Sequence, residues 1–355
     1  MSRQAHGAWR GVGLAASAMI GDGDGSARPL GGARGWIITD GKVGMIVQCR
    51  GVADALGLSY LHKQVSPSGL ARALSPWLPP RRSERFGDRG SAFAAPWPDI
   101  AIATGRLSIP YVRALKRLAG PDTFTVVLQN PRTGLNTADV IWVPQHDRLR
   151  GANVITTLTA PHSYSQARLS QLRRTMPAAI AALPAPRVAV VLGGPSGNYS
   201  FPAADRRRLA GALASLAALS VSFLITPSRR TPEALLEAVA ESTRPRPRIL
   251  WDGEGENPYP SFLAHADLLI VTADSVNMTG EACATGRPVY VFRPTGGSSK
   301  FARFHDALTR YGATRALPDR VCRLASWSYQ PLNSACEIAT AIEQRWLAQR
   351  SADIA

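Results

Sequence analysis

The chain has 355 residues, a length that suits two domains better than one core. Its hydrophobic fraction of 45% and charged fraction of 19% are those of a soluble globular protein, and no apolar run approaches the roughly 20 residues of a membrane-spanning helix. The net charge of +16 favours an anionic partner, and the lack of a zinc finger, helix-turn-helix or RNA-binding motif disfavours nucleic acid.

The arginines are scattered, so their excess over lysine also fits coding composition. Residues 1–34 are rich in Gly and Ala and show a faint signal-peptide pattern. We expect them to form a disordered extension that results from a start codon assigned too far upstream. Four cysteines without C-x-x-C spacing indicate free thiols, a reducing cytoplasm and no structural zinc (Cys49, Cys283, Cys322 and Cys336). The expected location is cytoplasmic, with peripheral contact to an anionic inner membrane as an option.

Short apolar runs alternate with helical stretches along the chain. In the first half, strands are predicted at 36–40, 99–103, 123–128, 139–143 and 154–158, helices at 45–56, 108–118 and 168–183, and a loop at 74–98. Pro184 and Pro186 mark a break. In the second half, strands are predicted at 187–192, 222–226, 248–251, 268–271 and 288–292, and helices at 203–219, 231–240, after 275, at 301–311 and at 333–349.

This alternation predicts parallel sheets joined by right-handed crossovers, an α/β fold. Two such halves predict two facing, Rossmann-like, doubly wound domains with a cleft between them. The expected division is an extension at 1–34, a first domain at 35–184, a second at 185–332 and a final helix at 333–355. Ligands of such sheets bind beyond the carboxyl ends of the strands, so the residues after each strand are the candidates.

In the first half these candidates lie in two loops and after one later strand. Asp40, Gly41, Lys42 and Gly44 surround the start of a helix, where Lys42 could meet an anion, although a plain strand-helix turn is an equal alternative. Gly105 and Arg106 form the turn after the next strand. His146, in the run PQHDR, is either a general base in the cleft or a structural histidine.

In the second half, glycines and arginines follow the first two strands. Gly193, Gly194 and Ser196 precede a helix and form a candidate phosphate cradle. Ser228, Arg229 and Arg230 gather at another helix start, where an anion would relieve the conflict between positive charge and the helix dipole; a solvated turn is the alternative.

The run TADSVNMTGEA follows a further strand. Thr272 leads in, and Asp274 or Ser275 is suited to be the N-cap. Met278 and Glu281 then share one helix face with small or apolar residues. An ionised carboxylate there needs donors, which sugar hydroxyls, a rim position or a nearby arginine would supply.

Several segments together resemble the elongated-mitochondria (mitochondrial fission) family of plants and Gram-negative bacteria. They are Trp36–Leu58, Trp97–Leu118, Thr123–Gly151, GGPSGNYSF and TADSVNMTGEACATGRPVYVF, and the likeness extends to the C-terminus. The family is similar in turn to GT-B glycosyltransferases, notably those that act on lipid-linked acceptors. It has also been labelled a nucleoside-diphosphate-sugar epimerase, but no GxGxxG fingerprint is present.

The resemblance implies a role for each candidate. Glu281 would accept hydrogen bonds from a nucleotide ribose, while the 274–278 turn and the Gly193 loop would hold the diphosphate. The loop at Asp40 would face the acceptor, and the final helix would cross back to the first domain. Related bacterial sequences usually read GKAGH in the first loop, whereas this chain has Met45 at the histidine position, which puts catalysis in doubt.

Two functions remain open. One is a glycosyltransferase that takes a nucleotide-diphosphate sugar, with Asp40 or His146 as the base; neither a metal nor another cofactor is expected, because no D-x-D motif follows a strand of the folded part. The other is a non-catalytic scaffold or regulator at a membrane surface, with the basic stretch 168–174 as a candidate lipid contact.

Overall fold

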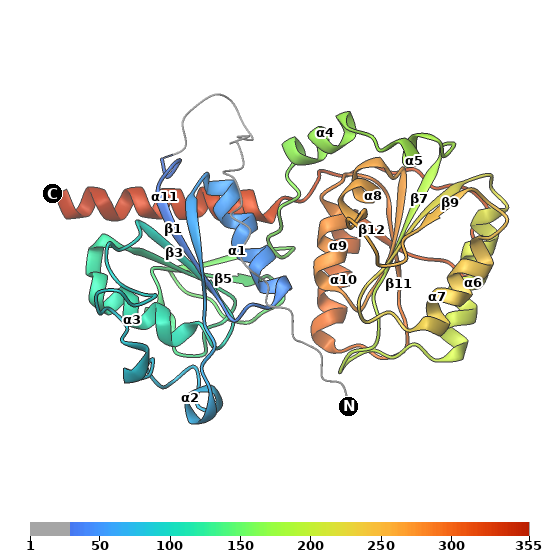
Figure 1. Ribbon diagram of the computed structural model, residues 1–355. Coiled ribbons are helices and arrows are strands. Elements are labelled where there is room, and N and C mark those ends of the chain that lie inside the picture. Colours follow the sequence, from blue (N-terminus) through green and yellow to red (C-terminus); the bar gives the residue numbers. More distant parts are fainter. Residues whose placement is uncertain (1–28, 355) are drawn as a thin grey trace, which may run out of the picture.

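The computed structural model describes residues 29–354, with side chains described up to Ser351. Most of the extension expected at 1–34 therefore lies outside the described residues. Two α/β halves lie side by side and are joined at one end by a linker and by the last helix (Figure 1).

The first half forms a six-stranded parallel sheet in the order β2-β1-β3-β4-β5-β6. Its strands are β1 (Arg34–Thr39), β2 (Ser59–Gln64), β3 (Ile100–Thr104), β4 (Phe124–Leu128), β5 (Val140–Pro144) and β6 (Val154–Thr157). Its helices are α1 (Val43–Leu56), α2 (Gly69–Ala73) and α3 (Ile109–Ala119), with short 3-10 turns at η1 (Arg82–Glu84), η2 (Gly120–Asp122) and η3 (Leu135–Thr137).

The second half forms another six-stranded parallel sheet, in the order β12-β11-β10-β7-β8-β9. Its strands are β7 (Arg187–Leu192), β8 (Ser222–Pro227), β9 (Arg248–Leu250), β10 (Leu268–Thr272), β11 (Val289–Phe292) and β12 (Thr314–Ala316). Its helices are α6 (Ala203–Ala217), α7 (Glu233–Thr243), α8 (Tyr259–His265), α9 (Val276–Cys283) and α10 (Ser299–Tyr311).

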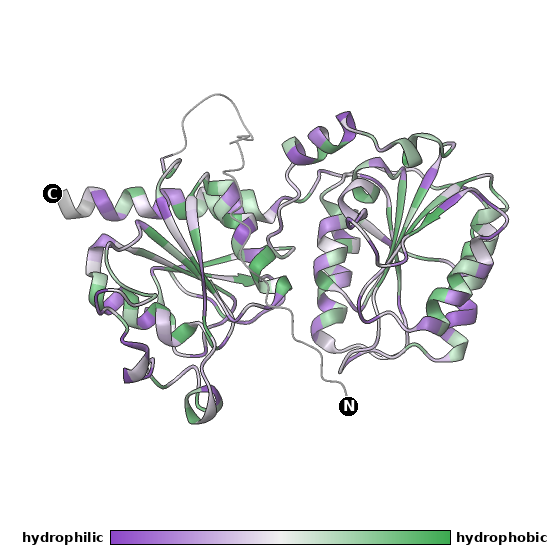
Figure 2. Ribbon diagram, in the orientation of Figure 1, coloured by the Kyte–Doolittle hydropathy of each residue, from purple (hydrophilic) through white to green (hydrophobic). Residues whose placement is uncertain are grey.

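Both sheets are covered by helices on both faces, which explains why their strands read as nearly continuous apolar runs. Alternate residues of one strand enter opposite cores: Val188 and Val190 pack under α6, whereas Ala189 and Val191 pack on the side of α9 and α10. Hydropathy follows this layering, with apolar strands inside and polar helix surfaces outside (Figure 2). The predicted α/β class with two doubly wound domains is confirmed.

The helix predicted at 168–183 is wrong as a single element. The chain forms α4 (Gln166–Arg174) and α5 (Ala178–Ala181), and the break falls at Pro177. Proline has no N–H to donate to the preceding turn, and its ring disfavours a helical conformation in the residue before it. The two short helices belong to the linker between the halves, and Leu169 of α4 is buried beside Ala264 and Ala284.

The last helix, α11 (Ser334–Ile354), returns to the first half (Figure 1). Its Ile338, Ala339 and Ile342 enter the core that contains Cys49 and Val52 of α1. The chain therefore passes between the halves twice. Among the described residues, no helix combines the length and the apolar character needed to cross a membrane.

The strand order defines where ligands can enter. It reverses between β1 and β3 in the first sheet and between β7 and β10 in the second, and α/β proteins bind ligands at such reversals, beyond the carboxyl ends of the strands. The helices that start there approach each other: a Cβ added to Gly44, in α1, would lie 3.3 Å from the Asn277 amide nitrogen, in α9. The two crevices therefore meet between the halves.

Candidate functional site

The crevice of the second domain centres on two side chains at the end of β10. Thr272 Oγ1 accepts the Gly193 N–H at 2.7 Å, and Asp274 Oδ2 accepts the Gly194 N–H at 3.0 Å. The Thr272 hydroxyl also donates to Asp274 Oδ1 at 2.7 Å. The predicted phosphate cradle therefore already holds a carboxylate of the protein, which binds one of its two amides directly and the other through Thr272.

Glycine is required in this loop because of close approach. A Cβ added to Gly193 would overlap the Asp274 carboxylate, and one added to Gly194 would overlap the Arg230 main chain. Arg230 completes the cluster: its guanidinium donates to Asp274 Oδ2 at 3.0 Å and to the carbonyls of Gly194 and Pro195, each at 3.0 Å. The structure thus brings the two predicted loops and Asp274 together.

The loop after β8 is also closed by its own hydrogen bonds. Ser228 N–H donates to Thr231 Oγ1 at 2.8 Å, and the Thr231 hydroxyl reaches the Gly193 carbonyl at 2.7 Å. Ser228 Oγ accepts the Arg230 N–H at 3.3 Å, whereas the Arg229 side chain is exposed. The Ser228 hydroxyl therefore shapes the loop, and Arg229 is the group that faces solvent.

Ser196 has a similar local task. Its Oγ accepts the N–H groups of Asn198 and Tyr199, each at 3.3 Å, and thereby shapes the turn that follows the two glycines. The loop after β11 lies against this turn: Ser200 N–H donates to the Thr295 carbonyl at 2.9 Å, and Gly297 N–H to the Asn198 carbonyl at 2.6 Å.

Helix α9 begins at the same crevice. Ser275, rather than Asp274, is the N-cap, with its Oγ accepting the Met278 N–H at 3.3 Å. Met278 packs against the core of the second domain. The cap fixes the direction of α9 and so places Glu281 at its second turn.

Glu281 is buried, so it does not occupy the rim position that its spacing left open. Its Oε2 accepts the Tyr259 hydroxyl at 2.6 Å, and the Tyr164 ring meets Tyr259 edge-on with centroids 6.0 Å apart. Burial raises the pKa of Glu281 above its usual value, and the hydrogen bond from Tyr259 partly opposes that rise. The nearest protein donor to the carboxylate is thus a tyrosine, not an arginine.

Two parts of this site were missed from the sequence. Tyr259 lies in α8, a helix that was not predicted. The loop Arg293-Pro294-Thr295-Gly296-Gly297-Ser298 directly follows β11, and this position after a strand is the signal that marks it as a candidate.

The first-domain candidates lie across the cleft. Lys42 Nζ reaches Asp40 Oδ2 at 2.7 Å, which ties the two predicted residues to each other, with the Lys42 side chain exposed. A Cβ added to Gly41, at φ +83°, would lie 2.7 Å from the Gln64 amide nitrogen. This loop therefore presents an ammonium group beside a carboxylate at the start of α1.

Met45 packs directly over Gly105, where an added Cβ would lie 2.5 Å from the methionine sulfur. Arg106 points elsewhere: it donates to the carbonyls of Ala73 at 3.2 Å and Ser75 at 2.6 Å, and so anchors the segment after α2. Gly105 is thus at the cleft with Met45, whereas the Arg106 guanidinium holds a neighbouring loop.

His146 follows β5 and meets α10 of the other domain. Its ring lies edge-on to Phe304 with centroids 5.8 Å apart. Burial and the positive charges of Lys300 and Arg303 together lower the pKa of His146 to about 4, and Asp147 partly opposes them. The imidazole is therefore uncharged at neutral pH.

Two facing Rossmann-like domains, with a last helix that returns to the first, define the GT-B architecture. The fold is similar to UDP-GlcNAc 2-epimerase from Methanocaldococcus jannaschii, with a TM-score of 0.52 and 10% identity over 88% of this chain and 99% of that one. The same enzyme in complex with UDP-GlcNAc and UDP gives a TM-score of 0.50 and 13% identity over the same shares.

The sequence narrows the assignment: the chain belongs to the mitochondrial fission ELM1 family, whose model matches residues 43–346. It is 34% identical over 277 residues to mitochondrial fission protein ELM1 of Arabidopsis thaliana, covering 71% of this chain and 65% of that protein. It is 31% identical over 160 residues to the uncharacterized protein RP120 of Rickettsia prowazekii (strain Madrid E), covering 44% and 45%. The matches thus span less than two thirds of either relative.

Proposed function

We propose that the chain binds a nucleotide-diphosphate sugar between its domains and transfers the sugar to an acceptor. The observation that carries this proposal is Glu281, a buried carboxylate on the helix that starts where the second sheet reverses its strand order. A buried carboxylate needs hydrogen-bond donors, and Tyr259 already donates to Oε2. The two hydroxyls of a ribose diol would supply further donors. The similar fold solved with UDP-GlcNAc and UDP supports this ligand class.

The diphosphate would lie at the starts of α9 and α10. Helix N-termini present unpaired N–H groups and a partial positive charge, and the Ser298 cap of α10 makes no side-chain hydrogen bond to its helix. Lys300 in the first turn of α10 adds a positive charge there. The two loop amides of Gly193 and Gly194 stabilise Asp274 instead, so under this proposal they shape the crevice without binding phosphate.

The candidate bases differ in how well they suit proton transfer. Asp40 is held by Lys42, and its side chain has little exposure. His146 is uncharged and able to accept a proton, but with a pKa of about 4 it is a weak base, whereas efficient general bases have pKa values near the working pH. The support for the proposal therefore comes from the ligand site, and neither Asp40 nor His146 is suited to be the base as it stands in this structure.

A thermal-shift screen tests the ligand class. At millimolar concentration UDP, GDP or CMP, or one of their sugars, is expected to raise the unfolding temperature, because a ligand that binds the folded state at 100 times its Kd stabilises it by about 2.7 kcal/mol. Inorganic diphosphate at equal ionic strength is the control for charge alone. If none of these nucleotides raises the unfolding temperature, the proposal is contradicted.

We also propose that the chain contacts an anionic membrane, as either a glycosyltransferase with a lipid-linked acceptor or a scaffold. In the stretch expected to make this contact, 168–174, Arg173 of α4 donates to the carbonyls of Ala264 at 3.1 Å and Thr285 at 3.2 Å, whereas Arg168 and Arg174 are exposed. A different surface, the α2 surface, carries four exposed apolar side chains: Leu70, Leu74, Trp77 and Leu78.

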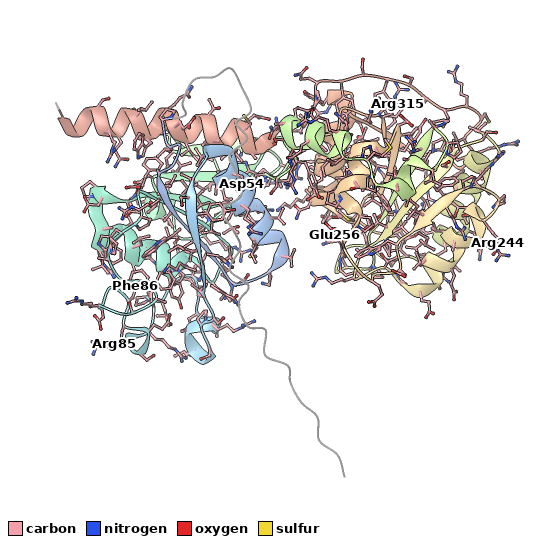
Figure 3. All side chains as sticks on the ribbon, turned by 45° about the horizontal axis from the view of Figure 1, so that its top comes forward. Asp54, Arg85, Phe86, Arg244, Glu256 and Arg315 are labelled. Carbon is pink, nitrogen blue, oxygen red and sulfur yellow. The ribbon has the colours of Figure 1, made fainter. Side chains whose placement is uncertain are left out.

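The α2 surface has the chemistry of a membrane-interface contact. Five exposed arginines follow or interrupt its apolar residues (Arg72, Arg81, Arg82, Arg85 and Arg89), against two acidic residues in the same stretch, Glu84 and Asp88. Exposed Leu and Trp next to arginines suit an anionic bilayer surface. The surface lies at the edge where the first-domain strands end, and Figure 3 shows Arg85 at the outer limit of that domain.

Vesicle sedimentation tests this contact. We expect binding to vesicles of phosphatidylcholine and phosphatidylglycerol, and a roughly 10-fold or larger loss in Leu70→Ala/Leu74→Ala, because each leucine gives up buried apolar area. The matched control is Leu61→Ala/Leu118→Ala: those leucines are 62% and 51% exposed, against 68% and 43% for the test pair. Equal loss in both double variants, or equal binding to pure phosphatidylcholine, would refute the α2 surface as the contact.

A further inference from the structure

A cavity of about 290 Å³ lies between the domains, and Glu281 is not among its lining residues. The first domain contributes the segment after β5 and one residue after β6, and the second domain contributes one face of α10. The lining residues are Gln145, His146, Arg150, Leu158, Arg303, Phe304, Ala307 and Arg310.

The lining is strongly cationic. It holds three arginines, Lys300 lies near the uncharged His146, and no lining residue carries a carboxylate. Arg303 and Arg310 have no ion pair within the described part of the chain, and both are exposed on α10. The positive charges of both domains therefore meet across this cavity, and no side chain of the lining compensates them.

Arg150 is held in place by its own loop. Its guanidinium donates to the carbonyls of Gln145 at 3.0 Å, Asp147 at 2.7 Å and Leu149 at 2.7 Å. Carbonyl oxygens orient a guanidinium without neutralising its charge. Asp147 is the one carboxylate that acts on the adjacent imidazole, and its Oδ1 accepts the Leu149 N–H at 3.0 Å.

We propose that this cavity binds the phosphate group of a small molecule and that the bound phosphate bridges the two domains. Guanidinium groups from opposite walls match the several acceptor oxygens of a phosphate, and they bind it with charge-assisted hydrogen bonds. The volume lies at the lower end of small-molecule pockets, which suits a phosphate with a small organic part.

None of the residues that line this cavity belongs to the proposed nucleotide crevice, and Lys300, at the start of α10, is the cation that lies near both. Helix α10 connects the two: Phe304 faces the cavity, while the next residue, His305, places Nε2 at 2.9 Å from the Ala273 carbonyl beside Asp274. A phosphate bound to α10 and to the first domain would therefore fix the position of the second domain, which carries the nucleotide crevice, relative to the first. The inference does not depend on the nucleotide proposal.

Titration calorimetry with sodium phosphate and with glycerol 3-phosphate, at constant ionic strength set by sodium chloride, tests the site on the full chain. We expect saturable binding of at least one probe, and a roughly 10- to 150-fold loss in both Arg150→Gln and Arg310→Gln, because each removes charge-assisted bonds from one wall. Binding of both probes identifies the phosphate group itself as the ligand, and binding of the ester alone identifies a phosphorylated metabolite.

The control is Arg244→Gln, an exposed arginine at the outer end of the second domain (Figure 3). His146→Gln provides a second first-domain variant that leaves the Arg150 loop contacts in place, and circular dichroism checks that each variant is folded. The proposal is overturned if neither probe binds at millimolar concentration, if Arg244→Gln weakens binding as much as Arg310→Gln, or if only the second-domain variant has an effect.

Discussion

Replacing Asp274 with alanine is expected to lower the midpoint of thermal unfolding of the second domain by roughly 6–12 °C, which corresponds to about 3 kcal/mol. The Asp274 side chain is 0% exposed and is bonded to Gly194, Thr272 and Arg230. Its loss leaves a buried N–H and a buried hydroxyl without an acceptor. Arg230 is partly exposed and can be hydrated, so we expect the lower end of the range for a broken buried ion pair.

The matched control for this prediction is Asp306→Ala. Asp306 also pairs with an arginine, Arg293, at 3.1 Å, but both side chains are exposed. Exposed pairs contribute about 0–1 kcal/mol, so this variant should unfold within a few degrees of the parent. Calorimetry of both variants compares them directly, and equal shifts would show that the Asp274 cluster does not hold the loops of the second domain.

Glu281→Ala is expected to weaken nucleotide binding by roughly 10- to 150-fold, the value of a hydrogen bond to a charged group. The carboxylate is the group that the proposal assigns to the ribose, whereas Tyr259 already donates to Oε2. Glu281→Gln keeps an acceptor oxygen but loses the charge, so it should fall between the parent and the alanine variant. Titration calorimetry with the nucleotide chosen by thermal shift gives the three affinities.

Glu237→Ala controls for the loss of an acidic side chain. Glu237 is exposed on α7 of the same domain and has no part in the crevice, so its variant should bind as the parent does. If Glu281→Ala is folded and binds as tightly as Glu237→Ala, Glu281 is not part of a nucleotide site.

The periodicity of the sequence was enough to predict both sheets, because strands buried on both faces leave long apolar runs such as Arg187–Leu192 and Leu268–Thr272. It missed β2 and β12, which lie at sheet edges, where the strands carry charged or polar residues. Helix α8 has seven residues and begins next to a proline, too short for a clear period.

The candidate site was predicted less well, because side-chain reach is not visible in spacing. Gly193 and Gly194 read as an open phosphate cradle, but the sequence could not show that Asp274, 80 residues later, fills it. The position of Glu281 on a helix beside a strand end was predicted, whereas its partner Tyr259 was not. A pair of residues that meet through the fold leaves no local pattern.

The sequence also could not show which arginines come together in the fold. In the sequence they are scattered, and their number fits coding composition as well as binding. The fold brings Arg150 of one domain and Arg303 and Arg310 of the other to one cavity, far from each other in the chain. Only the three-dimensional arrangement separates these three from the arginines that are simply solvated.

A crystal structure of the full chain with the nucleotide selected by thermal shift tests whether Glu281 binds a nucleotide. We expect ribose hydroxyls within hydrogen-bond distance of Glu281 and the diphosphate at the starts of α9 and α10. A nucleotide bound elsewhere, or a crevice in which Glu281 contacts no ligand atom, would contradict it.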